Sequence, residues 1–101
     1  MQKLVSLGKI LSDINRVKIL SLLQRENELC VCEFCDTLKL SQPLVSRHLK
    51  QMREADIVAT QQKGKWILYS LKHNTILECI LINIKDEIQE LPQIVSCTAR
   101  L

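Results

Sequence analysis

The sequence contains few residues that interrupt regular structure, with two glycines and two prolines among 101 residues. Glycine and proline are the main breakers of helices and strands, so helices should dominate. Repeats, low-complexity tracts and linker-like segments are also lacking. We therefore expect a single domain over residues 1–101.

Long hydrophobic runs are missing as well. The longest, residues 76–84, contains Glu78 and Asn83, whereas a membrane span needs about 18 uninterrupted apolar residues. We expect no secretory signal, because Gly8, Lys9, Ser12 and Asp13 interrupt the first apolar stretch. A cytoplasmic protein is expected, and there the cysteines should be reduced.

The sequence also lacks the usual residue patterns of catalysis. It shows no Ser/His/Asp set, no glycine-rich phosphate loop and no pair of acids suited to a cleft. These absences argue against an enzyme and favour a binding protein.

The positive charge is concentrated in the middle of the chain. Residues 41–72 carry six Lys or Arg residues against Glu54 and Asp56, whereas residues 73–101 are net acidic. A basic segment of this kind suits a nucleic-acid surface, although charge runs are often only solvated faces.

Apolar spacing predicts four helices in the first half of the chain. They cover about residues 2–12, a second helix that Asp13 or Ser12 caps and that ends near residues 24–27, then 31–38, and 42 to about 55. In the fourth, Val45, Leu49 and Met52 form a buried seam. Its other faces are polar and carry candidate DNA contacts: Gln42, Ser46, Arg47, Lys50 and Arg53. A short helix, a turn and a polar-faced second helix indicate a helix-turn-helix.

A β-hairpin follows the helix-turn-helix. Residues 57–61 and 66–71 are rich in β-branched and aromatic residues, and Gly64 can take the positive φ of the turn between them. This hairpin would form a wing, and Lys63 and Lys65 at its tip could reach phosphate or the minor groove.

The last predicted helix, Thr75–Leu91, carries more apolar residues than one contact face needs. Together with the apolar first helix it predicts a dimer interface, and twofold symmetry suits two DNA half-sites. The expected fold is mainly α with a small β-hairpin: a homodimeric winged helix-turn-helix with about five helices and a two-stranded wing.

Three of the five cysteines, Cys30, Cys32 and Cys35, lie within six residues. An odd number with three crowded together argues against a disulfide framework. Thiolates select soft ions, and structural zinc usually takes four ligands where this cluster offers three. Trivalent arsenic or antimony takes three sulfurs in a pyramid, so As(III) or Sb(III) is the expected ligand. Any one of these cysteines could instead be a core residue.

The spacing of the three cysteines sets a geometric condition. Residues in a helix turn by about 100° each, so Cys32 and Cys35 share a face while Cys30 does not. Either Cys30 precedes the helix, or ion binding unwinds its first turn. We hypothesise that closing three sulfurs on one ion distorts residues 30–35 and misplaces the fourth helix against DNA. A helix N-terminus also lowers the pKa of nearby thiols, which would ease ion binding.

Two segments carry a family resemblance. Glu-Leu-Cys-Val-Cys-Glu at 28–33 and Leu-Ser-Gln-Pro-Leu-Val-Ser-Arg-His-Leu-Lys at 40–50, followed by Gly64-Lys65-Trp66 and Tyr69, resemble the ArsR/SmtB winged-helix metal-sensing repressors. The resemblance covers about residues 5–91. It implies a homodimer that binds operator DNA without metal and is released by the ion.

The resemblance also implies roles for particular residues. Cys30 and Cys32 match the paired family thiols, Cys35 matches the third thiol of arsenite-responsive members, and Ser46, Arg47 and Lys50 match the groove-facing positions. The chain departs from the cadmium/lead members in having no cysteine before Cys30, and its last helix lacks the histidines of the zinc and nickel members. The matching last-helix site is therefore disfavoured.

Other interpretations remain open at this point. Cys79 suits packing, Cys97 suits a free thiol or a supplementary ligand, and His48 suits a packed, hydrogen-bonded residue better than a ligand. The signal could be thiol oxidation or another soft metal (Cd, Pb or Bi). A thiol oxidoreductase or metalloid carrier is a weaker alternative, because no thioredoxin-like context surrounds the cysteines.

Overall fold

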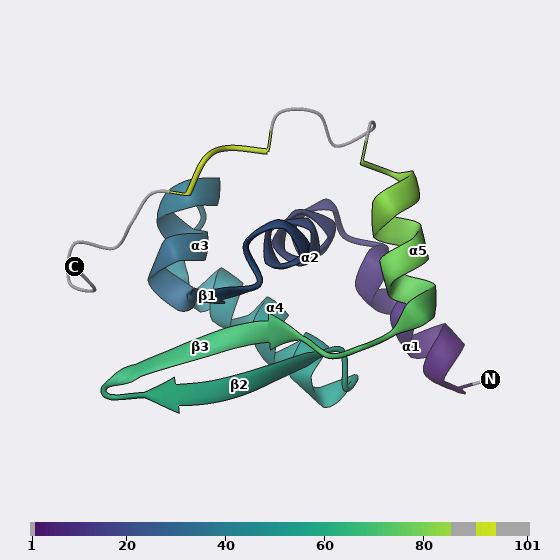
Figure 1. The fold of residues 1–101 in the computed structure, drawn as a ribbon, viewed down its shortest axis with the longest axis horizontal. Helices are drawn as coiled ribbons and strands as arrows, with labels where there is room; N and C mark the ends of the chain where they lie inside the picture. The colour runs from purple at the N-terminus through teal and green to yellow at the C-terminus, as the bar shows by residue number, and fades with distance from the viewer. Residues whose placement is uncertain (1, 86–90, 95–101) are drawn as a thin grey trace.

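The structure, a computed structural model, describes residues 2–85 and 91–94. Along the chain the elements are α1 (Gln2–Leu11), α2 (Ile14–Glu26), β1 (Glu28–Cys30), α3 (Val31–Leu38), α4 (Gln42–Glu54), β2 (Val58–Lys63), β3 (Trp66–Leu71) and α5 (Thr75–Asn83). Helices α3 and α4 form the helix-turn-helix and the β2–β3 hairpin forms the wing (Figure 1). The expected winged helix-turn-helix fold is confirmed.

Side-chain caps define where the helices begin. The Asp13 carboxylate accepts hydrogen bonds from the backbone N–H groups of Asn15 and Arg16, and so caps α2. The Ser41 hydroxyl accepts one from Leu44 N–H at the start of α4. Both caps satisfy donors that a helix N-terminus leaves without intrahelical partners, as the sequence predicts. Among the described residues, no helix is long and apolar enough to cross a membrane.

The core is centred on α2. Its residues Ile19, Leu20, Leu22 and Leu23 are almost completely buried, and the helix packs against α1, α5, β1 and β3. The predicted seam of α4, formed by Val45, Leu49 and Met52, is fully buried in the same cluster. Packing of this seam turns the opposite faces of α4 toward solvent.

The sheet has one strand more than the sequence predicts. Its order is β1-β3-β2 with all pairs antiparallel, and β1 places Glu28, Leu29 and Cys30 opposite Ser70, Tyr69 and Leu68. The hairpin itself is confirmed, and Gly64 adopts a φ of 63° in its turn. Strand β1 therefore links the first cysteine directly to the wing.

The last helix is shorter than expected, because α5 ends at Asn83 and not at Leu91. The Asn83 side chain donates a hydrogen bond to Cys79 O at 2.7 Å, a local bond that competes with continuation of the helix. Residues 91–94 are not helical, and Pro92 disfavours helical geometry at Leu91. Leu77 and Leu81 of the predicted apolar stripe are buried, whereas Ile88 lies outside the described residues.

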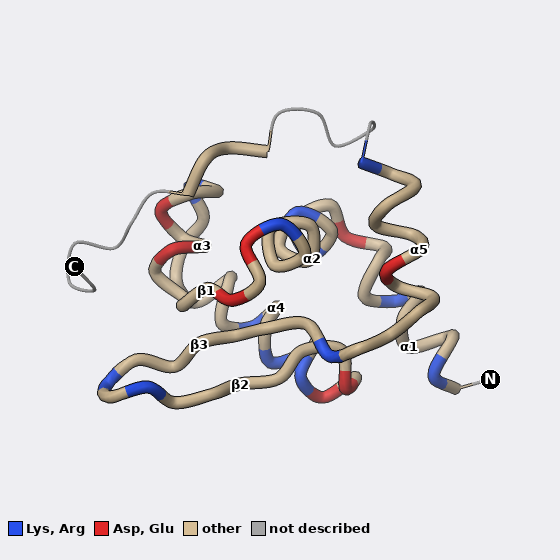
Figure 2. The backbone as a smooth tube through the Cα atoms, viewed as in Figure 1, with Lys and Arg blue, Asp and Glu red and all other residues tan. Residues whose placement is uncertain are grey.

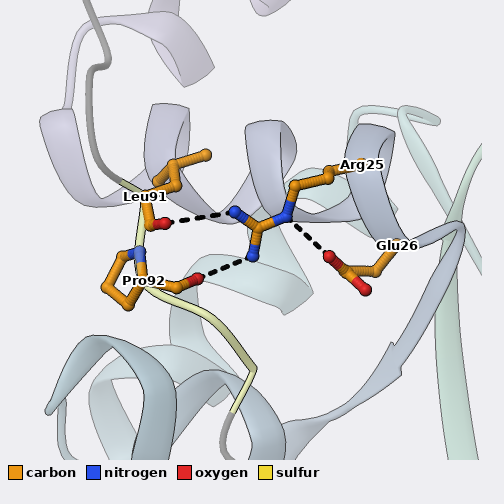
Figure 3. A network of polar contacts seen from close by, with 4 residues as sticks. All are labelled: Arg25, Glu26, Leu91 and Pro92. Atoms are coloured by element: carbon orange, nitrogen blue, oxygen red, sulfur yellow. Dashed lines mark hydrogen bonds and ion pairs between the residues drawn. The ribbon is translucent and has the colours of Figure 1, made fainter.

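Residues 91–94 return to the end of α2. The Arg25 guanidinium donates hydrogen bonds to Leu91 O at 3.1 Å and Pro92 O at 2.6 Å, and pairs with the Glu26 carboxylate (Figure 3). Leu91 and Ile94 pack against the core cluster. Figure 1 shows this short segment next to α3. A single arginine thus holds a distant part of the chain beside the helix that carries two of the clustered cysteines.

Candidate functional site

Cys30 occupies the junction between the sheet and α3. It is the last residue of β1 and the N-cap of α3, with an extended backbone conformation (φ −94°, ψ 166°). Its side chain is buried and its backbone lies opposite Leu68 of β3. Of the two sequence-based alternatives, the structure selects the first, since Cys30 precedes the helix and no unwinding is needed to reach it.

The first two cysteines of the cluster are already close together. The Sγ atoms of Cys30 and Cys32 lie 3.2 Å apart. Cys32 lies in the first turn of α3 and is partly exposed, so the pair opens toward solvent on one side. Two soft donors this close suit a thiophilic ion or an oxidant that reacts with neighbouring thiols.

Glu33 is a member of this site that the sequence analysis missed. Its carboxylate is buried and accepts a hydrogen bond from Cys30 N–H at 3.0 Å. The bond fixes the backbone of Cys30 at the helix entrance. Its sequence signal is the position of Glu33, three residues after the N-cap, which is the spacing of a capping box.

Cys35 lies one turn further along α3 and is half-buried. Its carbonyl accepts hydrogen bonds from the N–H groups of Lys39 and Leu40, which close the turn that leads to α4. Burial first, and then the negative charge of Asp36, raises the pKa of the Cys35 thiol. The expectation that the helix N-terminus lowers thiol pKa values is therefore wrong for Cys35, because burial and a neighbouring carboxylate oppose it.

The structure brings Cys30 and Cys32 together more closely than the full set of three. Within residues 2–85 and 91–94, no three Cys, His, Asp or Glu side chains are arranged to hold a metal ion. Cys97 lies outside the described residues, and Cys79 is exposed on α5 rather than packed in the core. A three-thiol site would therefore require a side-chain or backbone movement that brings Cys35 to the existing pair.

All seven predicted DNA contacts lie on the surface. Five of them come from α4 and two from the wing: Gln42, Ser46, Arg47, Lys50, Arg53, Lys63 and Lys65. Figure 2 shows Lys and Arg along α4 and at the tip of the hairpin, and α4 packs against β2. The two elements that can read DNA therefore form one continuous part of the molecule.

One of these lysines has a partner that the sequence analysis did not identify. Lys63 Nζ lies 2.9 Å from Glu28 Oε1. Glu28 begins β1, two residues before Cys30. This short strand therefore carries both the carboxylate that pairs with a wing lysine and the first cysteine of the cluster. The pairing depends on β1, which has no distinctive sequence pattern of its own.

His48 lies on the buried face of α4. It is buried, and among the described residues neither ring nitrogen has a hydrogen-bond partner. Burial lowers the pKa of His48, and the nearby Asp13 carboxylate only partly opposes this shift. The predicted packing role is supported, but the expected hydrogen bond is not present.

A basic helix-turn-helix with a lysine-tipped wing defines a DNA-binding transcriptional regulator. Comparison with known families gives the same class more specifically, because the model for bacterial regulatory proteins of the arsR family matches residues 13–60. The arsenical resistance operon repressor of Staphylococcus aureus is 37% identical over 83 residues, which cover 82% of this chain and 78% of the repressor. The chain belongs to the arsR family.

Other relatives agree with this assignment. The arsenic resistance transcriptional regulator ArsR1 of Pseudomonas putida is 51% identical over 63 residues, which cover 62% of this chain. The matched part spans only about half of that regulator, 49% of its length. The names of both relatives describe regulators of transcription rather than enzymes.

Solved structures confirm the fold. HlyU from Vibrio cholerae superposes with a TM-score of 0.77 at 30% identity, covering 86% of this chain and 92% of HlyU. The AntR antimony-specific transcriptional repressor gives a TM-score of 0.70 at 25% identity, covering 87% of this chain and 82% of AntR.

Proposed function

We propose that this chain is a metalloid-responsive transcriptional repressor that acts in the cytoplasm as a homodimer. In this proposal the protein binds operator DNA without inducer, and As(III) or Sb(III) held by Cys30, Cys32 and Cys35 releases it. The observation that carries the proposal is the 3.2 Å separation of the Cys30 and Cys32 sulfurs at the entrance of α3. The names of arsenic- and antimony-related relatives support the choice of ion.

The donor set suits a trivalent metalloid. Three thiols supply soft sulfur ligands, and Cys32 and Cys35 lie three residues apart on α3 and so share a face. When bound, such an ion supplies a bridge between sulfurs on different elements. Cys30 belongs to β1, whereas Cys32 and Cys35 belong to α3. Because the Cys30 and Cys32 sulfurs are already 3.2 Å apart, we propose that binding draws Cys35 and the end of α3 toward this pair.

Movement of α3 would be passed to the recognition helix. The Cys35 carbonyl anchors the turn between α3 and α4 through the N–H groups of Lys39 and Leu40, and α3 packs directly against α4. A displacement at Cys35 thus moves the start of α4, where Gln42 and Ser46 are exposed. Small changes in the angle of a recognition helix are enough to remove base contacts.

The homodimer is proposed from the apolar surface of α1 and α5. Leu4 and Val5 of α1 and Ile76 and Ile82 of α5 each remain more than half exposed in the single chain. The two helices lie at the same end of the molecule (Figure 1), and both pack against α2. A second copy is the occupant that suits an apolar face on a protein whose DNA targets would be two half-sites.

The thiol pair also fits a second candidate function, the sensing of oxidants. A peroxide could oxidise Cys30 and Cys32 to a disulfide, with loss of two protons and two electrons from the thiols and reduction of the peroxide to water. The short separation of the two sulfurs favours this reaction equally well. The response to each inducer distinguishes the two functions.

The test is DNA binding by fluorescence anisotropy, with the DNA segment upstream of the chain's own gene. Arsenite, antimonite, cadmium, lead, bismuth, zinc and hydrogen peroxide are titrated separately into the complex. We expect release by arsenite or antimonite at concentrations far below those of the other ions. Cys30→Ser, Cys32→Ser and Cys35→Ser should keep operator affinity but need at least about 10-fold more arsenite for release, which is the effect of losing one of three ligands.

Cys79→Ser is the matched control, because Cys79 lies on α5 away from the cluster. It should respond to arsenite like the wild type. Release that persists in all three cluster variants would refute the site. Release by peroxide alone would favour the oxidant sensor, and indifference to every inducer would refute both.

A further inference from the structure

Arg16, in the first turn of α2, bridges two other helices. Its Nε donates a hydrogen bond to Ile10 O at 2.9 Å, and its Nη2 donates one to Lys9 O at 3.0 Å. Both acceptors belong to the last turn of α1. The third bond runs from Nη1 to Oε1 of Gln51 on α4, at 2.6 Å. One guanidinium therefore joins α1, α2 and α4.

The position of Arg16 is itself fixed. The Asp13 carboxylate that caps α2 accepts a hydrogen bond from Arg16 N–H, so the backbone of Arg16 is anchored. The guanidinium adds donors at the end of α1, where Lys9 O also accepts hydrogen bonds from the N–H and hydroxyl of Ser12. A cation at a helix C-terminus also interacts favourably with the helix dipole. The guanidinium is planar and presents its donors in a rigid fork, so these bonds restrict the orientation of all three helices.

The bond to Gln51 restrains α4 at a place where packing alone does not. The inner face of α4 is held by Val45, Leu49 and Met52, which set the rotation of the helix but do not reach its outer side. Gln51 is exposed on that outer side, next to Lys50. Because arginine only donates, Oε1 of Gln51 must face Arg16, which orients the side-chain amide and ties the outer side of α4 to α1.

We propose that Arg16 is a positioning residue for operator binding, which holds the recognition helix α4 at a defined angle to α1 through Gln51. Helix α1 carries Leu4 and Val5 of the proposed dimer face. The bridge therefore sets the orientation of each recognition helix relative to the twofold axis, on which simultaneous contact with two half-sites depends. This inference rests on the proposed operator binding by a homodimer and is independent of the inducer.

The test compares Arg16→Lys, Gln51→Ala and the double variant. Lysine keeps the positive charge but carries its donors on one nitrogen, so it cannot reach acceptors that Arg16 bonds through three separate nitrogens. Gln51 is exposed, so its replacement should not disturb folding. Affinity is measured for the upstream operator segment and for unrelated DNA of equal length. Non-specific binding depends on phosphate charge and should be insensitive to helix orientation.

Each single variant should lose about 10-fold in operator affinity while binding unrelated DNA within about 2-fold of the wild type, which is the loss expected when base contacts are misaligned. The double variant should be no weaker than the weaker single variant, because both changes break the same bridge. Arg25→Lys is the matched control, since Arg25 lies on the same helix but bonds to Leu91 and Pro92 rather than α4. It should retain the operator preference.

Additive losses in the double variant, equal losses on both DNAs, or unchanged operator affinity would each overturn the proposal. A wild-type protein with no preference for the operator segment would instead refute the proposed function, and this inference with it. If the wild type prefers the operator over unrelated DNA and both single variants keep that preference unchanged, the role of the Arg16–Gln51 bridge is refuted while the proposed function stands.

Discussion

Two exposed surfaces of this molecule differ sharply in chemistry. The outer faces of α4 and the wing carry Arg47, Lys50 and Lys65, whereas the outer faces of α1 and α5 carry leucine, valine and isoleucine. Both surfaces are built from short amphipathic elements that pack on one core. The difference shows that the core determines the fold, while the residues left outside it determine which partner each face suits: a polyanion or another apolar surface.

The largest effect is expected when a charge is placed on the apolar face, because both surfaces then carry charged side chains. Ile82→Glu should dissociate the proposed dimer, because in a twofold interface the substitution buries a carboxylate from each copy. Operator affinity should fall by about 100-fold or more, since one half-site is then bound at a time. Sedimentation velocity and anisotropy measure the two effects.

Ile82→Leu is the control for this substitution. It changes the same exposed position of α5 but keeps an apolar side chain, so self-association and operator affinity should be retained. An Ile82→Glu protein that remains a dimer would show that the apolar face has another role.

A smaller effect is expected on the basic face, where the two lysines at the tip of the wing differ in their partners. Lys63 is paired with Glu28, whereas Lys65 makes no ion pair with any residue that the structure describes. Lys65→Gln should lower operator affinity about 3- to 10-fold near 0.1 M salt and reduce the salt slope by about 1. Lys63→Gln should do less, because Glu28 already neutralises part of its charge.

Glu28→Gln provides the reciprocal measurement. It should tighten DNA binding and steepen the salt dependence, since Lys63 is then available to phosphate. Equal effects of the two lysine substitutions, with none from Glu28→Gln, would mean that the ion pair does not reduce the contribution of Lys63 to DNA binding.

The smallest effect concerns the inner side of α4, which belongs to neither surface. The pKa of buried His48 is lowered, so the unfolded chain binds more protons than the folded one as pH falls below about 6.5. Stability is therefore fully present above that pH and should decrease below it. We expect the Tm to fall by about 2–5 °C between about pH 7 and pH 5.

His48→Asn should make this acid dependence smaller, which thermal unfolding at a series of pH values measures. Burial alone would raise the pKa of Asp13, but the capping bonds and the charges of His48 and Arg16 together lower it, so that carboxylate stays ionised through this range. An unchanged pH profile in His48→Asn would assign the acid sensitivity to other groups.

The helix-turn-helix and the wing could be predicted because their signals are local. Ser41 begins α4, its apolar seam has helical spacing, and Gly64 marks the hairpin turn. Strand β1 could not be predicted, because its three residues become a strand only by pairing with β3, about 40 residues later in the chain. The end of α5 was placed too late because the apolar pattern continues beyond Asn83, where the helix ends in the structure.

The spacing of the cysteines predicts a soft-ligand cluster, which stays a prediction. It also left open whether Cys30 precedes the third helix, and the structure shows that it does. The capping-box spacing of Glu33 was a usable local signal that the sequence analysis missed. The Glu28–Lys63 pair and the Arg16–Gln51 bridge each join side chains 35 residues apart on different elements, so no sequence period could reveal them.

The placement of Cys30 in strand β1 has a consequence for protein engineering. Cys30 is paired with Leu68 in the sheet, so its position depends on β3 as well as on the start of α3. Grafting residues 30–35 alone onto another winged helix would transfer the three proposed sulfur ligands without β3, the strand that holds Cys30 in place. An engineered protein that is meant to respond to the proposed ligand would therefore need residues 28–30 together with their partners in β3.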